Sequence, residues 1–312
     1  MEPFLILTGP TAVGKTALSM QLAAELDAEI ISADSRQVYR ELNVGTAKPD
    51  EEDLQRVRHH FINERFLGEA FTAGIFQREA YARIEDVLDR GRTPLIVGGS
   101  TLYLKALKHG LANIPDIPED VRADIRKRLD DEGPETLYAA LQSVDPQAAE
   151  TMDPTKSQRI ARALEVYEAT GTPITAYHDE QPPPPYAFLT VVLHRDRRQL
   201  YDRINRRVDR MLDDGLIEEV RQLLDAGHDL SINLLRTIGY KEPVAYLRGE
   251  ISHDEMVRRI KRNTRRYAKR QLTWFRRDED NVWVDAAADS NDLRSDIRQL
   301  LAQASDVSSP AS

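Results

Sequence analysis

The chain has 312 residues, of which 41% are hydrophobic and 30% charged, values close to those of ordinary globular proteins. It contains no cysteine, which excludes disulfides, thiolate zinc sites, iron–sulfur clusters and a cysteine nucleophile. The length suggests about two folding units. No apolar run is long enough to cross a membrane, and residues 1–8 lack the basic flank of a signal peptide. We therefore expect a cytoplasmic protein without a membrane partner.

In chain order, the first elements alternate between strands and helices. An apolar strand is expected at 4–8, followed by a glycine-bearing loop, a helix at about 15–26 and a second strand at 29–32. A helix at about 72–90 leads into a strand at 94–97. This alternation predicts an α/β fold of the P-loop NTPase type, a parallel sheet with helices on both faces.

The middle of the chain differs from the beginning. Helical patterns at 119–131, 135–143 and 157–170 occur without convincing strands, which predicts an inserted all-helical lobe that ends in a stiff proline-rich connector at 181–185. A strand at 187–194, a helix at 197–226, a basic helix at about 253–274 and a strand at 282–285 follow. The expected divisions are 1–114 and 186–288 for the core, 115–185 for the lobe, and 289–312 for a C-terminal helix and disordered tail.

The net charge of −9 by itself argues against a nucleic-acid partner, but the charge is unevenly distributed along the chain. Residues 256–277 carry ten basic side chains and no acidic one. Such a helix suits a phosphate backbone, with an affinity that falls as salt rises. The alternative is a solvated charged helix, which ten like charges without a counter-charge in the segment disfavour.

The loop after the first strand matches the pattern G-x-x-x-x-G-K-[ST], at the strand-to-helix junction where its mechanism requires it. Backbone N–H groups and the helix N-terminus can face one anion, Lys15 can reach the outer phosphate, and the Thr16 hydroxyl can bind Mg²⁺. The pattern does not distinguish ATP, GTP and an isoprenoid diphosphate, and a glycine turn without a ligand is the alternative. The expected diphosphate-binding residues are Gly9, Pro10, Thr11, Ala12, Val13, Gly14, Lys15 and Thr16.

Asp34 follows the second strand and is a candidate catalytic base. In a parallel sheet this position lies at the carboxyl edge, beside the phosphate loop. A carboxylate there could bind Mg²⁺, orient a nucleophile or accept its proton. The alternative is a structural aspartate that caps a helix or turn.

Around Asp34 the chain resembles the tRNA dimethylallyltransferases, also called tRNA isopentenyltransferases. The resemblance covers residues 4–276 and includes motifs that are not general to P-loop proteins. Val13 and Ser100 stand where serine and threonine are expected in many members, and the lack of cysteine excludes the zinc finger of eukaryotic members, so the bacterial type is indicated. The motifs are 9–16, the pair 34–39 and 45–49, then 97–103, 158–165, 238–240 and 269–274.

The resemblance implies transfer of a dimethylallyl group from dimethylallyl diphosphate, with Mg²⁺, to N6 of the adenine just 3′ of a tRNA anticodon. It implies Asp34 as the base at N6, Arg203 and Lys15 on the departing diphosphate, and Thr11 beside the same pocket. Mg²⁺ is the expected cofactor, and tRNA and dimethylallyl diphosphate are the expected partners of a monomer.

The resemblance also implies contacts to the anticodon stem-loop from several parts of the chain. The flipped adenine would be read by 34–37, and the stem-loop held by the lobe and the basic helix. The expected tRNA-binding residues are Asp34, Ser35, Arg36, Gln37, Ser100, Arg122, Gln158, Arg159, Ile160, Ala161, Arg162, Arg236, Gly239, Tyr240, Lys241, Lys269, Arg270, Gln271, Thr273, Trp274 and Arg276.

Two other functions fit part of the pattern. A P-loop kinase of a small metabolite would use the same loop, Mg²⁺ and acid, but would need neither the lobe nor the basic helix. A nucleotide-switched RNA-binding protein would bind without making product. Other metal sites are not expected, because His59 and His60 are adjacent and the remaining histidines lack ligand spacing, so that they are surface or packing residues.

Overall fold

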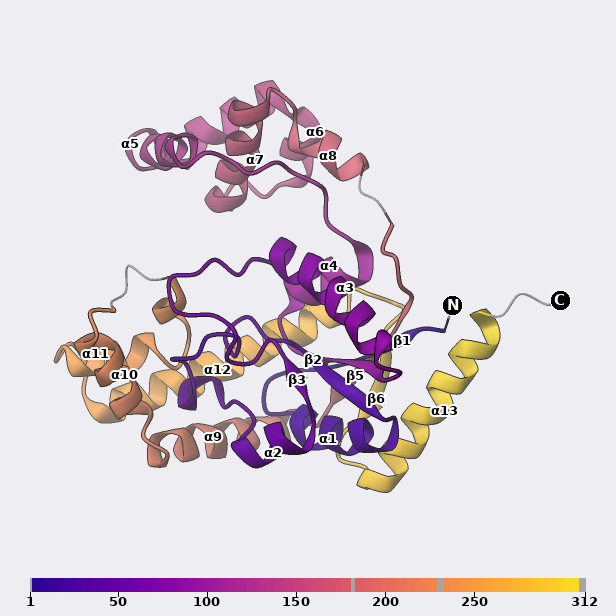
Figure 1. Cartoon of the computed structure of the whole chain (residues 1–312). Coiled ribbons are helices and arrows are strands. Elements are labelled where there is room, and N and C mark those ends of the chain that lie inside the picture. The colour runs from indigo at the N-terminus through magenta and orange to yellow at the C-terminus, as the bar shows by residue number, and fades with distance from the viewer. Residues whose placement is uncertain (1, 181–182, 229–232, 309–312) are drawn as a thin grey trace. The chain divides into compact units, whose positions relative to one another are not determined.

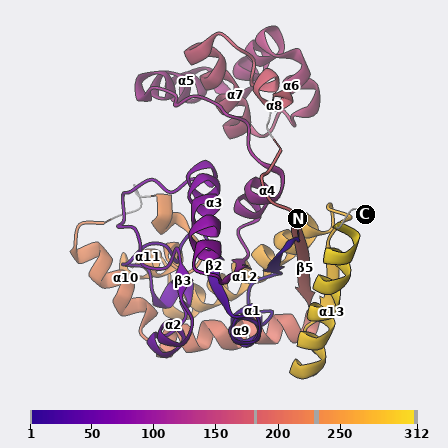
Figure 2. The ribbon, with the colours of Figure 1, turned by 45° about the vertical axis from the view of Figure 1, so that its right-hand side comes forward.

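The computed structural model describes residues 2–180, 183–228 and 233–308 (Figures 1 and 2). The chain divides into two compact units, which we call the core unit (Met1–Lys108 with Pro185–Ser312) and the helical unit (His109–Pro184). The helical unit begins slightly before the expected boundary at 115. Part of the expected proline connector (181–182) and all but the first residue of the expected disordered tail (308–312) lie outside the described residues, and Ser308 is the last residue of a helix.

The elements of the core unit up to the helical unit are β1 (Phe4–Thr8), α1 (Lys15–Glu25), β2 (Ala28–Ala33), η1 (Val44–Thr46), α2 (Glu51–Arg56), β3 (His59–His60), α3 (Ala73–Asp89), β4 (Thr93–Gly98) and α4 (Thr101–His109). The helical unit contains α5 (Glu119–Val144), α6 (Pro146–Thr151), α7 (Ser157–Thr170) and α8 (Ile174–Asp179). The core unit then resumes with β5 (Phe188–His194), α9 (Arg197–Asp213), α10 (Leu216–Asp225), η2 (Asn233–Arg236), α11 (Lys241–Leu247), α12 (His253–Phe275), β6 (Val282–Asp285) and α13 (Ser290–Ser308).

The core unit is built on a six-stranded sheet of order β3-β2-β4-β1-β5-β6, in which every pair of neighbours is parallel. β1 lies between β4 and β5, so its apolar run is buried on both sides, as a central parallel strand requires. The expected parallel α/β fold is confirmed. All carboxyl ends of the strands meet at one edge, and the loop after β1 lies there.

Helices cover both faces of the sheet. On one face, side chains of α1, α9 and α13 pack with the strands in one apolar cluster, to which Leu22, Ile204 and Ile297 contribute. On the other face lies α3, seen above the sheet in Figure 1 while α1 lies below it. There Phe76 of α3 stacks on Tyr103 of α4 with ring centroids 4.6 Å apart. The covered sheet leaves only its edges for a site.

Two glycines change the expected helices. The helix expected at 197–226 is wrong as a single element, because Gly215 adopts φ 94° and separates α9 from α10. Only glycine enters this region without strain. In the helical unit, Gly133 (φ 82°, ψ 168°) kinks α5 between the two helices expected at 119–131 and 135–143. That unit has its own core, in which Leu137, Ile160 and Leu164 are buried.

His59 and His60 form the short edge strand β3, which the apolar pattern did not predict. His60 is buried, and its Nε2 lies 2.8 Å from Oε2 of Glu29. Arg90 also donates to Glu29, through Nε at 3.0 Å and Nη2 at 2.8 Å. His60 is therefore a packing residue in a buried ionic cluster.

No helix in the described part of the chain combines the length and the hydropathy needed to span a membrane.

The Glu29 cluster makes stability depend on pH in a defined direction. Burial alone would raise the pKa of Glu29, but the hydrogen bonds from Arg90 and His60 lower it to about 2, below its ordinary value of 4.5. The stabilisation is therefore present above pH 4.5 and is lost as the pH falls toward 2. We expect Glu29→Gln to lower the free energy of unfolding at pH 7 by about 2–3 kcal/mol in urea titrations. The difference in unfolding free energy between the wild type and this variant should shrink as the pH falls.

Asp27→Asn is the matched control, because Asp27 pairs with Arg92 at the surface with a side chain 72% exposed. Its cost should stay below about 1 kcal/mol. Equal costs for both variants would contradict a stabilising role of the Glu29 cluster.

Candidate active site

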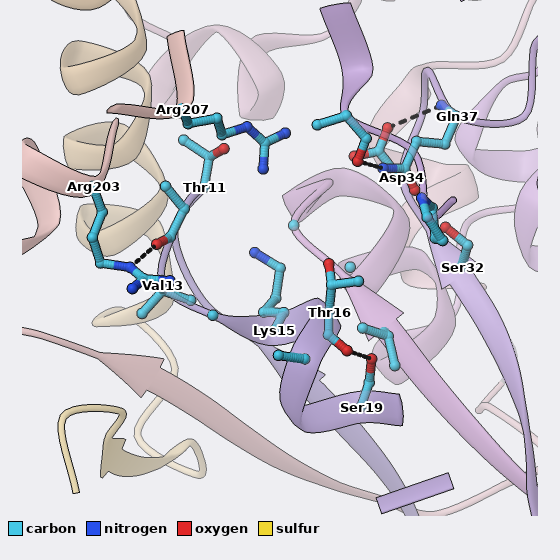
Figure 3. A pocket seen from close by; sticks show the side chains of 18 of the residues that line it. Thr11, Val13, Lys15, Thr16, Ser19, Ser32, Asp34, Gln37, Arg203 and Arg207 are labelled. Atoms are coloured by element: carbon cyan, nitrogen blue, oxygen red, sulfur yellow. Dashed lines mark hydrogen bonds between the residues drawn. The ribbon is translucent and has the colours of Figure 1, made fainter. Parts of the chain in front are cut away.

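A cavity of about 840 Å³ opens at the carboxyl edge of the sheet, within the core unit (Figure 3). It is lined by residues 11–17, which comprise the loop and the first turn of α1, by the ends of β2 and β4, and by side chains of α9 and α12. In open parallel sheets, ligands bind at this edge. The cavity is therefore the candidate site. Of the residues expected to bind phosphate, 11–16 form one of its walls, whereas Gly9 and Pro10 are not among the lining residues.

The backbone of the loop between β1 and α1 is tightly constrained by its neighbours. Gly9 has φ 143°, and a Cβ at this residue would lie 2.5 Å from the carbonyl oxygen of Leu193 on β5. Ala12 adopts a left-handed φ of 65°. Arg203 Nε donates to the carbonyl oxygen of Ala12 and Arg195 Nε to that of Val13, both at 2.8 Å. With these carbonyls engaged and the first N–H groups of α1 unpaired within the helix, the loop presents donors to an anion.

Val13 departs from the serine expected in many family members, and its burial explains why this is tolerated. The side chain is fully buried and belongs to the apolar cluster under the sheet. Because it packs inward, a hydroxyl at this position is not needed for the fold of the loop.

Lys15 lies at the centre of the close-up in Figure 3, with Arg203 on one side and Asp34 on the other. Its Nζ donates to the carbonyl oxygens of Gly9 at 2.9 Å and Pro10 at 3.0 Å. Burial and the nearby Arg207 guanidinium lower the pKa of Lys15 to about 8, although Asp34 acts in the opposite direction. Lys15 is therefore charged at neutral pH, and a bound anion would stabilise that charge.

Asp34 has the structural role that its sequence position allowed, and it also lines the cavity. Its Oδ1 accepts from the backbone N–H of Arg36 at 2.8 Å and of Gln37 at 3.2 Å, which makes it the cap of a turn. Its Oδ2 accepts no hydrogen bond from the described residues, and Asp34 lines the cavity. Ser100 Oγ accepts from the N–H of Ser35 at 2.9 Å and so joins this turn to the end of β4.

α9 contributes cations that the sequence analysis only partly identified. Arg203 lines the cavity as expected, and Arg206, Arg207 and Arg210 also line it, with Asp209 and Asp213 among them. Arg207 was missed. Burial lowers its pKa, and its Nη2 donates to the carbonyl oxygen of Thr46 at 3.1 Å. The spacing of these arginines along one helical face is the signal that could have identified it.

Gln271, which is among the residues expected to bind tRNA, lines the cavity and is held inside the protein. It is 3% exposed, accepts from the N–H of Thr11 at 2.9 Å through Oε1, and donates to the carbonyl oxygen of Gly99 at 2.8 Å through Nε2. It thus connects α12 with the phosphate loop and the end of β4. Both ends of the amide are engaged inside the protein.

The remaining residues expected to bind tRNA fall into three groups. On α12, Lys269, Arg270 and Thr273 are exposed and Trp274 is half-buried, and Arg276, which follows the end of the helix, is exposed. Near α11, Lys241 is exposed, Tyr240 is buried, Gly239 has φ 93° and donates to Glu242, and Arg236 ends η2. In the helical unit, Arg122, Gln158, Arg159 and Arg162 are at least partly exposed, whereas Ile160 and Ala161 are buried in its core, so that their side chains pack instead of facing a ligand.

The basic segment of α12 is less uniform than its sequence suggested. Its buried stripe includes Met256, Ile260 and Ala268. Three of its cations have acidic partners in the fold, since Arg258 and Arg259 pair with Glu255 and Lys261 pairs with Asp209. Within the described part of the chain, Arg262, Arg266, Lys269 and Arg270 form no ion pair and are exposed.

The parallel sheet, the glycine loop that leads into α1, and the cavity beside it define a P-loop protein. A model of the family described as IPP transferase matches residues 37–278. The chain belongs to this family.

Individual relatives agree over most of the chain. It is 58% identical to a tRNA dimethylallyltransferase of Salinibacter ruber, over 90% of this chain and 87% of the relative. It is 47% identical to tRNA dimethylallyltransferase 1 of Syntrophotalea carbinolica, over 91% of each. Among solved structures, the tRNA isopentenylpyrophosphate transferase of Bacillus halodurans matches with a TM-score of 0.73 at 38% identity, over 98% and 99% of the two chains. A eukaryotic dimethylallyltransferase described as acting on tRNA matches with a TM-score of 0.82 at 28% identity, over 96% and 78%.

The lowered pKa of Lys15 predicts a pH-dependent affinity for inorganic diphosphate. Lys15 carries its charge below pH 8 and loses it above, so the affinity measured by calorimetry should fall up to about tenfold between pH 7 and pH 9. In Lys15→Arg the charge persists at both pH values. The variant should therefore show a smaller fall, while the titration of diphosphate itself affects both proteins equally. Identical pH slopes would remove Lys15 from the anion site.

Proposed function

We propose that this protein is a tRNA dimethylallyltransferase, which transfers the dimethylallyl group of dimethylallyl diphosphate to N6 of the adenine 3′ of the anticodon. The observation that carries the proposal is the cavity in which a phosphate loop, the Asp34 carboxylate and the arginines of α9 converge. The names of relatives that match about nine tenths of the chain support it. We expect the enzyme to act as a monomer in the cytoplasm.

The proposed reaction requires little covalent chemistry from the protein. The C1–O bond of the allylic diphosphate breaks, C1 bonds to N6 of adenine, and one N6 proton leaves. Negative charge develops on the diphosphate, where Lys15, Arg203 and the loop N–H groups would stabilise it. The free Oδ2 of Asp34 would accept the proton. Thr11, whose N–H is held by Gln271, borders the same cavity.

Mg²⁺ would be held by few protein ligands. No group of three or more acidic or histidine side chains in the described ranges is arranged to hold a metal. Thr16 is exposed at the start of α1 and lines the cavity, which fits a cation bound mainly by substrate oxygens and water. Mg²⁺ would neutralise charge on the diphosphate.

The adenine would leave its stack to reach the carboxylate. The turn 34–37 would read it, because Asp34 and Gln37 line one wall of the cavity. The exposed cations of α12 would contact the phosphate backbone of the stem-loop, together with Gln158 and Arg159 of the helical unit.

The first test is mass spectrometry of nucleosides from unmodified tRNA incubated with protein, Mg²⁺ and dimethylallyl diphosphate. We expect a gain of one C5H8 unit on adenosine. A parallel reaction contains ATP in place of the prenyl donor. ATP turnover there, without any prenylated adenosine in the first reaction, would refute the proposal and favour a kinase or an RNA-dependent NTPase.

The role of Asp34 can be separated from binding. Asp34→Ala should lower the single-turnover rate by about 10²–10⁴ while retaining tRNA affinity, because loss of a general base affects the chemical step. Asp50→Ala is a control, since Asp50 is an exposed cap of α2. A near-normal rate in the Asp34 variant would remove this residue from the base role.

Backbone binding by α12 predicts a salt-dependent difference between two arginines. Arg266→Gln should weaken tRNA binding and reduce the slope of log affinity against log salt by about 1. Arg258→Gln changes the same charge on the same helix, but Arg258 already pairs with Glu255 at 2.8 Å. Its slope should change less. Equal changes in filter-binding titrations would show that the unpaired face is not the contact.

A further inference from the structure

The loop 43–47, which contains the start of the Gly-Thr-Ala-Lys-Pro motif, adjoins the cavity wall and contacts Gln37. Nε2 of Gln37 donates to the carbonyl oxygens of Thr46 at 3.2 Å and Ala47 at 3.3 Å. Both partners are acceptors, so the nitrogen of the amide has to face them and the amide cannot be flipped. Within the described residues, Oε1 of Gln37 accepts no hydrogen bond. The loop therefore fixes the orientation of the Gln37 amide, and its Oε1 stays available to accept a hydrogen bond from a ligand.

The position of this loop depends on one carboxylate from α10. Oε2 of Glu219 accepts from the N–H groups of Asn43 at 2.9 Å and Val44 at 2.7 Å. Oε1 accepts from the N–H of Gly45 at 3.1 Å and from the hydroxyl of Tyr240 at 2.8 Å. Three successive backbone donors of the loop thus converge on a single ionised group. Hydrogen bonds of this kind are stronger than those between neutral groups.

Tyr240 closes this arrangement from the other side. It is 1% exposed, and a Cβ added to Gly45 would lie 2.5 Å from its Cζ. Glycine at this point of the motif therefore permits the ring to pack directly on the loop backbone. Burial and the Glu219 carboxylate raise the pKa of Tyr240, so its hydroxyl stays protonated and donates.

We propose that Glu219 is a positioning residue for adenine recognition, acting through the loop 43–47 to hold the amide of Gln37 with its oxygen available to the base. The proposal rests on the function proposed above. The N6 amino group of adenine can donate a hydrogen bond to this oxygen. Guanine carries an acceptor, O6, at the corresponding position and cannot donate there. The orientation of Gln37 therefore selects for an amino group at the base that reacts.

The chemistry of Glu219 makes a conservative test possible. Its four partners are all donors, so an amide in its place would turn an NH₂ group toward at least two of them. The less costly orientation directs NH₂ to Tyr240, whose hydroxyl can accept, and leaves the N–H of Gly45 without an acceptor. Glu219→Gln should therefore loosen the loop without emptying the space that the side chain fills.

Glu218→Gln is the matched control. Glu218 is the preceding residue of α10, its side chain is 60% exposed, and its carboxylate pairs with Arg221 at 3.3 Å on the same helix. The Glu218→Gln variant therefore removes the same charge from the same helical turn, at a residue that does not bond to the loop 43–47.

The first measurement is competition binding of anticodon stem-loops with adenine or guanine at the target position. In the wild type and Glu218→Gln, the adenine stem-loop should bind more tightly than the guanine one. In Glu219→Gln this ratio should fall about tenfold, even if both affinities change. A loss shared equally by both stem-loops would indicate a merely structural role and overturn the proposal.

The second measurement is kcat/KM for the tRNA in a double-mutant cycle with Gln37→Leu. Glu219→Gln should cost about tenfold in the wild-type background and no more than about twofold when Gln37 is already absent. Equal costs in both backgrounds would show that Glu219 does not act through Gln37. If the wild type itself forms no prenylated adenosine, the proposed function fails, and this outcome is distinct from failure of the positioning role.

Discussion

The close approach of the phosphate loop to the neighbouring strand is the constraint on which the site depends. Gly9 passes so near the carbonyl oxygen of Leu193 that no side chain fits, and the loop then turns through a left-handed residue, Ala12, into α1. Two arginines from the segment after β5 bind the loop carbonyls, and Gln271 of α12 binds the N–H of Thr11. Segments nearly 200 residues or more apart in the sequence thus fix the geometry of one short loop.

Electrostatics give the cavity its preference for an anion. Arg207 makes the charge on Lys15 less favourable, Arg210 does the same to Arg207, and burial removes water from both Lys15 and Arg207. Asp34 offsets part of this cost. A diphosphate would offset much more of it, because it would place negative charge beside both cations in a region of low dielectric.

Features that depend on neighbouring residues in the sequence could be predicted from it. Features that depend on contacts with residues far along the chain could not. The phosphate loop, β1 and β6 could be predicted because glycine spacing and apolar runs are local signals. Gln271 could not, because its two hydrogen bonds join it to residues more than 170 positions away. Asp34 shows a third case, since position alone allowed a turn cap or a base: one carboxylate oxygen caps the turn, and the other accepts no hydrogen bond from the described residues, which leaves the base role open.

The break at Gly215 couples two sides of the cavity mechanically. A single left-handed residue sets the direction of α10 relative to α9, so the helix that supplies the arginines is joined almost directly to the helix that supplies Glu219. A Cβ at Gly215 would meet no neighbouring atom, so the requirement for glycine comes from the backbone alone. Lengthening or relaxing this corner would shift the arginines of α9 and the Glu219 carboxylate relative to each other.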